Sequence, residues 1–123
     1  TLVSASGITR RARERMGKEL TPELIFQSAR EGDAQAREIV EETVFYLAVG
    51  LANLINLFNL DEIRIGGGVA EAAEIISPDL LALTEKNVFP VYKGKARIHK
   101  ASQGYFGGVI GASTLLLHEI NMI

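Results

Sequence analysis

The sequence of 123 residues contains no cysteine and no tryptophan. Without cysteine the chain can form neither a disulfide framework nor a thiolate metal site, and we expect a cytoplasmic protein. The chain also lacks an excess of positive or negative charge, since it has 13 Lys and Arg residues and 15 Asp and Glu residues. This balance gives no reason to expect nucleic-acid binding through this segment.

The sequence has no long hydrophobic run either. The longest apolar stretch, Val44 to Phe58, includes Asn53 and Asn56 and is too short to cross a bilayer comfortably, so no membrane partner is expected. What remains is an ordinary globular composition, 47% hydrophobic and 23% charged, which predicts one domain over residues 1–123. The chain begins at Thr1 rather than at Met, so we expect a piece of a longer protein.

The first segment with helical periodicity is SASGITRRARERMG. Its apolar residues Ile8, Ala12 and Met16 recur every four positions and form one face. The rest of the helix surface carries arginines at positions 10, 11, 13 and 15. Such a basic cluster could meet a phosphate group, but a solvated helix face is the preferred interpretation.

Two further helices have clear starts. Thr21 followed by Pro22 is typical of an N-cap and a first helical position, and Gly32 predicts the end of that helix. Asp33 then caps a long helix that extends to about Phe58.

The long helix changes character at Val44. From there to Phe58 it is apolar nearly all round, which predicts burial between layers. Asn53 and Asn56 would then need hydrogen-bond partners. Two interpretations remain open for these amides: structural bonds to neighbouring loops, which we favour, or a ligand site.

The second half of the chain alternates strands and helices. Short strands are predicted at residues 62–65, where apolar and polar residues alternate, and at about residues 96–101. Helices are predicted at VAEAAEIIS, at residues 78–88 behind an N-cap at Ser77, and at ASTLLLHEI near the end. This alternation favours an α/β fold with parallel pairing, mostly helical with a small sheet.

Three consecutive glycines, Gly66 to Gly68, lie between the first strand and a helix-like run. A dinucleotide fingerprint would need a glycine or alanine where Glu71 stands, and a P-loop would need a Gly-Lys-Ser/Thr sequence. Glu71 and Glu74 suit the positive end of the following helix but would repel a polyphosphate there. A triphosphate cradle is therefore disfavoured. Two interpretations remain: close approach of a neutral ligand portion such as a base or ribose, or a tight strand-to-helix turn alone.

The stretch LANLINLFNLDEIRIGGGVAE closely resembles the late part of the ROK family, a group of repressors, open reading frames and sugar kinases. The flanking segments TLVSASGITRRARE, LTPELIFQSAREGDAQAREIVEE and GGVIGASTLLLHEI agree, so the resemblance covers nearly all 123 residues. It implies the two-domain actin-like and hexokinase-like ATPase fold, which is ribonuclease H-like. This chain would be the C-terminal part of that fold in a glucokinase-like member.

The resemblance also implies a site. Gly66, Gly67 and Gly68 with the adjoining Val69 match the turn that contacts adenosine in the family. The family's phosphate loops, catalytic aspartate and zinc motif would lie upstream of Thr1, so neither a catalytic residue nor a metal ligand is expected here. ATP with Mg²⁺ and a sugar would serve the intact parent, and no cofactor is expected on this chain alone. A homo-oligomer is expected, because missing strands would leave a sheet edge and apolar surface uncovered.

The other polar residues form no reactive constellation that the sequence reveals. His99 and His118 lack metal-ligand neighbours, the adjacent acidic pairs at 41–42 and 61–62 diverge on a helix or strand, and the serines have no evident base partner. Three functions remain: a sugar kinase whose adenosine side this segment supplies, a sugar-responsive repressor, and a scaffold domain. The intact glycine triplet favours the kinase, which would be inactive without its upstream part.

Overall fold

The computed structural model describes residues 2–72 and 75–101. The described chain is mostly helical, with a two-stranded parallel sheet in its second half. Its elements are α1 (Ala5–Met16), α2 (Pro22–Arg30), α3 (Ala34–Phe58), β1 (Glu62–Ile65), α4 (Gly68–Ala72), α5 (Pro78–Asn87), the 3-10 helix η1 (Pro90–Tyr92) and β2 (Arg97–Lys100).

The helix starts follow from short polar side chains that cap free backbone N–H groups. The predicted caps are confirmed: Thr21 accepts from the Leu24 N–H, Asp33 from that of Ala36 and Ser77 from that of Leu80. Ser4 caps α1 in the same way, because its Oγ accepts from the Gly7 N–H at 3.1 Å. Helices α1, α2, α3 and α5 therefore begin where the sequence supplies an acceptor.

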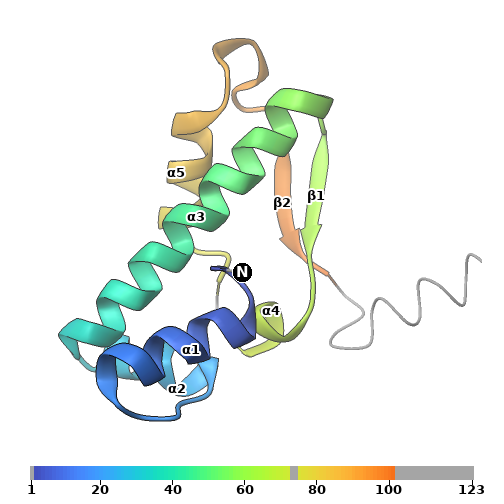
Figure 1. Ribbon diagram of the computed structural model, residues 1–123. Helices are drawn as coiled ribbons and strands as arrows, with labels where there is room; N and C mark the ends of the chain where they lie inside the picture. The colour runs from blue at the N-terminus through green and yellow to red at the C-terminus, as the bar shows by residue number, and fades with distance from the viewer. Residues whose placement is uncertain (1, 73–74, 102–123) are drawn as a thin grey trace, which may run out of the picture.

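Helix α3 is the central helix of the described structure. Helices α1 and α2 lie beside its N-terminal half, and the sheet and α5 lie along its C-terminal half (Figure 1). The core near α1 and α2 contains Ile8, Ile25 and Ile39, all fully buried. A second cluster forms farther along α3, where Val44, Ala48 and Leu51 pack with Leu80 of α5. One helix thus contributes to both cores.

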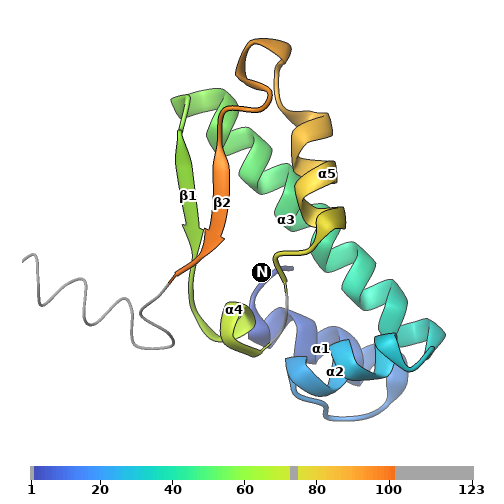
Figure 2. The same ribbon diagram turned by 180° about the vertical axis from the view of Figure 1, so that it is seen from behind.

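The sheet is parallel, as the alternation of elements predicts. Ile63 lies opposite Ile98, and the two strands run side by side in both views (Figures 1 and 2). Ile63, Ile65 and Ile98 pack against α3 and α5, while Glu62 and Arg64 lie exposed at the surface. The parallel arrangement brings the carboxyl ends of both strands to the same edge, where the glycine turn begins.

The prediction that residues 44–58 are buried between layers is wrong for one face of the helix. Helix α3 presents one face to α5 and the sheet, and its opposite face lies at the surface of the described structure. Large apolar side chains exposed there are Phe45, Tyr46, Leu54, Leu57 and Phe58, with exposed fractions from 42% to 74%. Two layers of described elements are enough to bury only one side of this helix.

The two amides on α3 differ. Asn56 donates to the Asn87 carbonyl at 3.1 Å and accepts from the Phe89 N–H at 2.8 Å, so it holds the segment that follows α5. This confirms the structural interpretation for Asn56. Asn53 is exposed to solvent, so the expectation that it needs a protein partner is wrong.

Some predictions fall outside the described residues. The helix predicted at VAEAAEIIS is observed as α4, which ends at Ala72, before the undescribed residues 73–74. The predicted final helix, with Ser113 and His118, also lies outside the described part. Within the described part, no helix is both long enough and apolar enough to cross a membrane.

Candidate functional site

The glycine turn follows β1 directly and leads into α4. Gly67 has φ +91°, a backbone region that side-chain-bearing residues rarely adopt. A Cβ on Gly66 would come within 3.4 Å of the Ala101 Cβ, at the end of the neighbouring strand. The prediction that at least one glycine has positive φ is confirmed, and the triplet therefore shapes the backbone.

A cavity of about 330 Å³ lies directly on this turn. All four predicted site residues line it. Its described walls are Val3, Ser4 and Ala5 before and at the start of α1, Leu47 of α3, Ile65, Gly66, Gly67, Gly68 and Val69 of the turn, and Ile75. The structure thus brings the glycine turn and the start of α1 together.

The cavity has the position expected of a ligand site in an α/β protein. Ligands of such folds bind outside the carboxyl ends of parallel strands, and the cavity lies at that end of β1. Its volume lies at the small end of the range for small-molecule pockets, about 300–1,000 Å³. A compact ligand portion fits such a space.

The described walls of the cavity carry no charged side chain. Ser4 supplies a hydroxyl, which also lies 3.1 Å from the Ser6 Oγ, and the remaining walls are glycine backbone and apolar side chains. Neutral walls favour an uncharged ligand surface, because an ion loses its hydration without a compensating partner. A base or ribose suits these walls, whereas a triphosphate or Mg²⁺ would find no described side chain to hold it.

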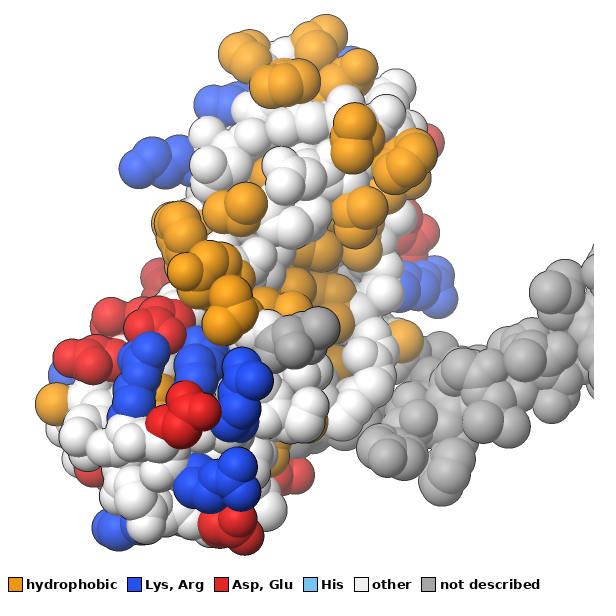
Figure 3. Space-filling model, in the orientation of Figure 1, with side chains coloured by type: hydrophobic (Ala, Val, Ile, Leu, Met, Phe, Trp, Pro, Cys, Tyr) orange, Lys and Arg blue, Asp and Glu red, His pale blue; other side chains and the backbone are white. Residues whose placement is uncertain are grey.

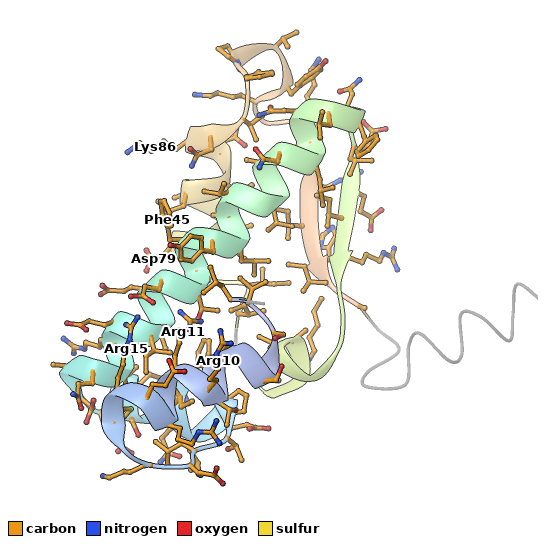
Figure 4. All side chains as sticks on the ribbon, viewed as in Figure 1. Arg10, Arg11, Arg15, Phe45, Asp79 and Lys86 are labelled. Carbon is orange, nitrogen blue, oxygen red and sulfur yellow. The ribbon has the colours of Figure 1, made fainter. Side chains whose placement is uncertain are left out.

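A larger crevice of about 580 Å³ lies between α2, α3 and α5. Its floor includes Phe26, Val44 and Leu83, and its rim carries Asp79 and Lys86, which extend from α5 in Figure 4. None of the predicted site residues reaches this crevice. The smaller cavity is the better candidate, because it combines the glycine turn, which has positive φ at Gly67, with the carboxyl end of β1.

Two features of the site were not predicted. The first is the wall formed by Val3 and Ser4, for which the N-cap position of Ser4 was the available signal. The second is Arg11, for which a solvated helix face was the preferred interpretation. Arg11 is only 4% exposed, because its side chain extends from α1 onto α3. That part of the prediction is wrong.

Arg11 belongs to a group of charges between α1 and α3. Its Nη1 donates to Glu42 Oε2 at 2.9 Å, and Arg15 donates to both carboxylate oxygens of Glu42 at 2.8 and 3.0 Å. The hydrogen bonds from Arg15, and then those from Arg11, lower the pKa of Glu42 from its ordinary value. Hydrogen bonding to Glu42 in turn raises the pKa of Arg15.

The sequence as a whole matches the model of the ROK family over residues 1–119. The chain belongs to the ROK family. The resemblance found in the sequence is thereby confirmed for the family.

Its relatives in this family include both enzymes and a regulator. The chain is 30% identical to a glucokinase from Halalkalibacterium halodurans, over 98% of this chain and 41% of the relative. It is 28% identical to the DNA-binding transcriptional repressor Mlc of Escherichia coli, over 79% of this chain and 24% of the relative. The chain therefore spans less than half the length of either relative.

The fold is that of ROK sugar kinases. A ROK family glucokinase from Streptomyces griseus, solved with glucose and AMPPNP, matches with a TM-score of 0.75 at 23% identity. The match covers 93% of this chain and 42% of the glucokinase. The predicted fold class is confirmed at this level, while the position of the chain at the C-terminal end of that fold stays a prediction.

Proposed function

We propose that this chain forms the adenosine side of an ATP-dependent sugar kinase that transfers phosphate to a hexose or a related sugar. The observation that carries the proposal is the cavity on Gly66–Gly68 and Val69 at the carboxyl end of β1, whose described walls carry no charged side chain. Glycine lets a planar base or ribose approach the backbone closely. The relatives named glucokinase support a kinase as the function of the complete protein.

The proposed role is binding and orientation of the nucleotide. Phosphoryl transfer needs groups that stabilise charge on the phosphates and orient the attacking hydroxyl. The described cavity walls contain no carboxylate, lysine or arginine. These residues therefore offer no charged group that could act on ATP phosphates or hold Mg²⁺, and we propose that the 123-residue chain alone is inactive.

Calorimetric titration of the 123-residue chain tests the binding role. Adenosine and ADP are expected to bind with similar affinity, because the walls contact the nucleoside, whereas pyrophosphate is expected not to bind. A chain that bound pyrophosphate but not adenosine would contradict the proposal.

A matched pair of variants locates the site. Gly67→Val places a side chain into open space at the cavity and is expected to abolish adenosine binding. Gly94→Val is the control, because Gly94 also has positive φ (+73°) and open space around it, but does not line the cavity. Equal binding by both variants would place the ligand elsewhere.

Catalysis is tested separately with a coupled ATP-consumption assay on the purified chain and several hexoses. No sugar-dependent turnover is expected above background. Turnover that followed the protein peak through purification would show that the chain holds a complete active site, and the inactivity proposal would be wrong.

The second candidate is the sugar-sensing part of a ROK repressor, which the likeness to Mlc favours. In that case the cavity would have no need to bind a nucleotide. Failure of both adenosine and ADP to bind a fully folded chain would favour this candidate. We also propose that the protein acts in the cytoplasm and forms a homo-oligomer, the latter because large apolar side chains of α3 are exposed.

A further inference from the structure

Arg11 is a charged residue in the interior of a small protein, and its contacts are specific. Its side chain is 5% exposed. The guanidinium donates to three groups on two segments: Glu42 Oε2 and Thr43 Oγ1 on α3, at 2.9 and 2.7 Å, and the Leu2 carbonyl before α1. Figure 4 shows Arg11 and Arg15 where α1 passes α3. A buried charge of this kind is stable only when its donors are satisfied.

The attachment to α3 is rigid. Thr43 is fully buried, and its hydroxyl donates its single proton to the Ile39 carbonyl at 2.7 Å. The Thr43 Oγ1 is therefore free to act only as an acceptor toward Arg11. Glu42 is held on its other side by the two bonds from Arg15. The guanidinium is thus fixed in orientation by two consecutive residues of one helix.

The remaining contact joins this fixed group to the wall of the cavity. Arg11 Nη2 donates to the carbonyl of Leu2, and the next three residues, Val3, Ser4 and Ala5, line the same cavity as the glycine turn. Ser4 in turn accepts two hydrogen bonds: its Oγ accepts from the Gly7 N–H, and its carbonyl accepts from the Ile8 N–H. The position of Leu2 therefore affects both the wall and the first turn of α1.

Arginine is required for this geometry. The planar fork of a guanidinium can donate in several fixed directions at once, whereas a lysine ammonium cannot span the same acceptors. Arg11 Nε is buried without a hydrogen-bond partner among the described residues. This unpaired donor opposes stability, so the three bonds made by Nη1 and Nη2 carry the arrangement.

We propose that Arg11 is a positioning residue for the glycine-turn cavity. Through the Leu2 carbonyl, Arg11 fixes the wall formed by residues 3–5, and the position of this wall sets the affinity for adenosine nucleotides. Arg11 itself does not line the cavity. The inference rests on the proposed nucleotide binding, but its structural part, the fixing of the wall, can be measured without any ligand.

The experiment compares Arg11→Ala with Arg15→Ala in the full 123-residue chain. Arg15 is the matched control, because it shares Glu42 with Arg11 but is more exposed and does not contact Leu2. ADP affinity is measured by calorimetry at a temperature where each variant is fully folded. We expect Arg11→Ala to weaken ADP binding about tenfold, as loss of a charged hydrogen bond does, and Arg15→Ala to change it less than about twofold.

Residue-resolved hydrogen exchange supplies the ligand-free measurement. The Gly7 and Ile8 amides, which donate to Ser4, are expected to exchange about tenfold faster in Arg11→Ala. The Ala36 amide, which Asp33 caps in the same way on α3, is expected to stay unchanged. A general loss of stability would accelerate all three amides together, so the difference between them isolates the wall.

Added guanidinium at millimolar concentration, far below denaturing levels, is expected to restore both the slow exchange and the ADP affinity of Arg11→Ala. If Arg11→Ala fails to fold, Thr43→Val keeps the charge and removes one acceptor, and the same amides are expected to exchange faster to a smaller extent. The proposal would be overturned if the Gly7 and Ile8 amides exchanged at the wild-type rate in folded Arg11→Ala. It would also be overturned if folded Arg11→Ala bound ADP with the affinity of the wild-type chain. A wild-type chain that bound no ADP would refute the proposed function and the affinity part of this proposal, while exchange would still decide whether Arg11 fixes the wall.

Discussion

The two ends of α3 are packed in different ways. Around α1 and α2, charged side chains form ion pairs over a fully buried aliphatic core, whereas the end near η1 and β2 leaves Leu57, Phe58 and Phe89 more than half exposed. In Figure 3 acidic and basic side chains gather together at the α1–α2 end, whereas hydrophobic side chains are spread over the rest of the face, with a few charged ones at its margins. At the α1–α2 end, charged residues of the chain pair with one another, while the other end offers apolar surface to a further element or partner.

The difference follows from how each end meets α3. Helices α1 and α2 both pack against α3 and contact each other, so the hydrogen bond from Arg11 to Thr43 lies buried between α1 and α3. At the other end, α5 and the two strands cover only one side of α3. The cavity on the glycine turn lies between these regions, with one wall from α1 and the other from the end of β1.

The largest expected effect separates the two ends by stability. Ile25→Ala, in the fully buried core near α2, is expected to lower the free energy of unfolding by about 3 kcal/mol. Leu57→Ala makes a similar truncation on a side chain that is 74% exposed, and its effect is expected below about 0.5 kcal/mol. Urea denaturation of both variants measures the difference. Similar losses in both would mean that Leu57 is buried in solution, and the contrast between the ends would fail.

The second effect concerns association. The exposed apolar face of α3 is expected to make the chain self-associate, and Leu57→Glu should weaken this about tenfold, because a charge cannot be buried there without a partner. Ala34→Glu is the control, since it adds the same charge at the other, exposed end of the same helix. Light scattering over a concentration series measures both. A wild-type chain that stayed monomeric at high concentration would show that this face needs no partner copy.

Sequence patterns predicted the local structure well where a single residue type determines it. Thr21, Asp33 and Ser77 marked helix starts because a short acceptor side chain has few other roles before a helical run. The strand at residues 62–65 and its parallel pairing followed from periodicity and from the helix that intervenes before the next strand. The glycine triplet predicted a turn with positive φ, which Gly67 adopts.

Long-range contacts could not be predicted in the same way. Arg11 has the same type and nearly the same position as Arg10, and only the path of α3 decides that Arg11 is buried and Arg10 exposed. The exposed face of α3 depends likewise on how many elements reach it, which hydrophobic periodicity does not contain. The wall at Val3 and Ser4 arises from a contact between segments about sixty residues apart, so the sequence showed only half of the cavity.

A third, smaller effect compares glycines at two places. Gly67→Ala is expected to destabilise the chain by about 1 kcal/mol, because alanine is strained at φ +91°. Gly50→Ala, at an exposed position inside α3 with nothing within 4 Å, is expected to stabilise it by up to about 1 kcal/mol. Thermal unfolding of the two variants gives the signs. Stabilisation by both would mean that the glycine turn adopts an ordinary backbone conformation in solution.

The smallest effect is a pH dependence at the α1–α3 contact. The pKa of Glu42 is lowered from its ordinary value of 4.5, first by the hydrogen bonds from Arg15. A carboxylate whose pKa is lower in the folded chain contributes its full stabilisation above the ordinary value and loses it as the pH falls through the folded value. Glu42 is 38% exposed, so the contribution is expected below about 1 kcal/mol.

Comparing wild type with Glu42→Gln from pH 7 down to pH 3 isolates this contribution. The difference in unfolding free energy between the two chains is expected to be constant near neutral pH and to shrink as the solution becomes more acidic than pH 4.5, because protonated Glu42 resembles the amide. A difference that stayed constant down to pH 3 would show that the ionised form of Glu42 is not what joins α1 to α3. The attachment of Arg11 to α3 would then depend on the Thr43 hydroxyl, and the ion pairs of Glu42 would no longer contribute to the contrast between the two ends of α3.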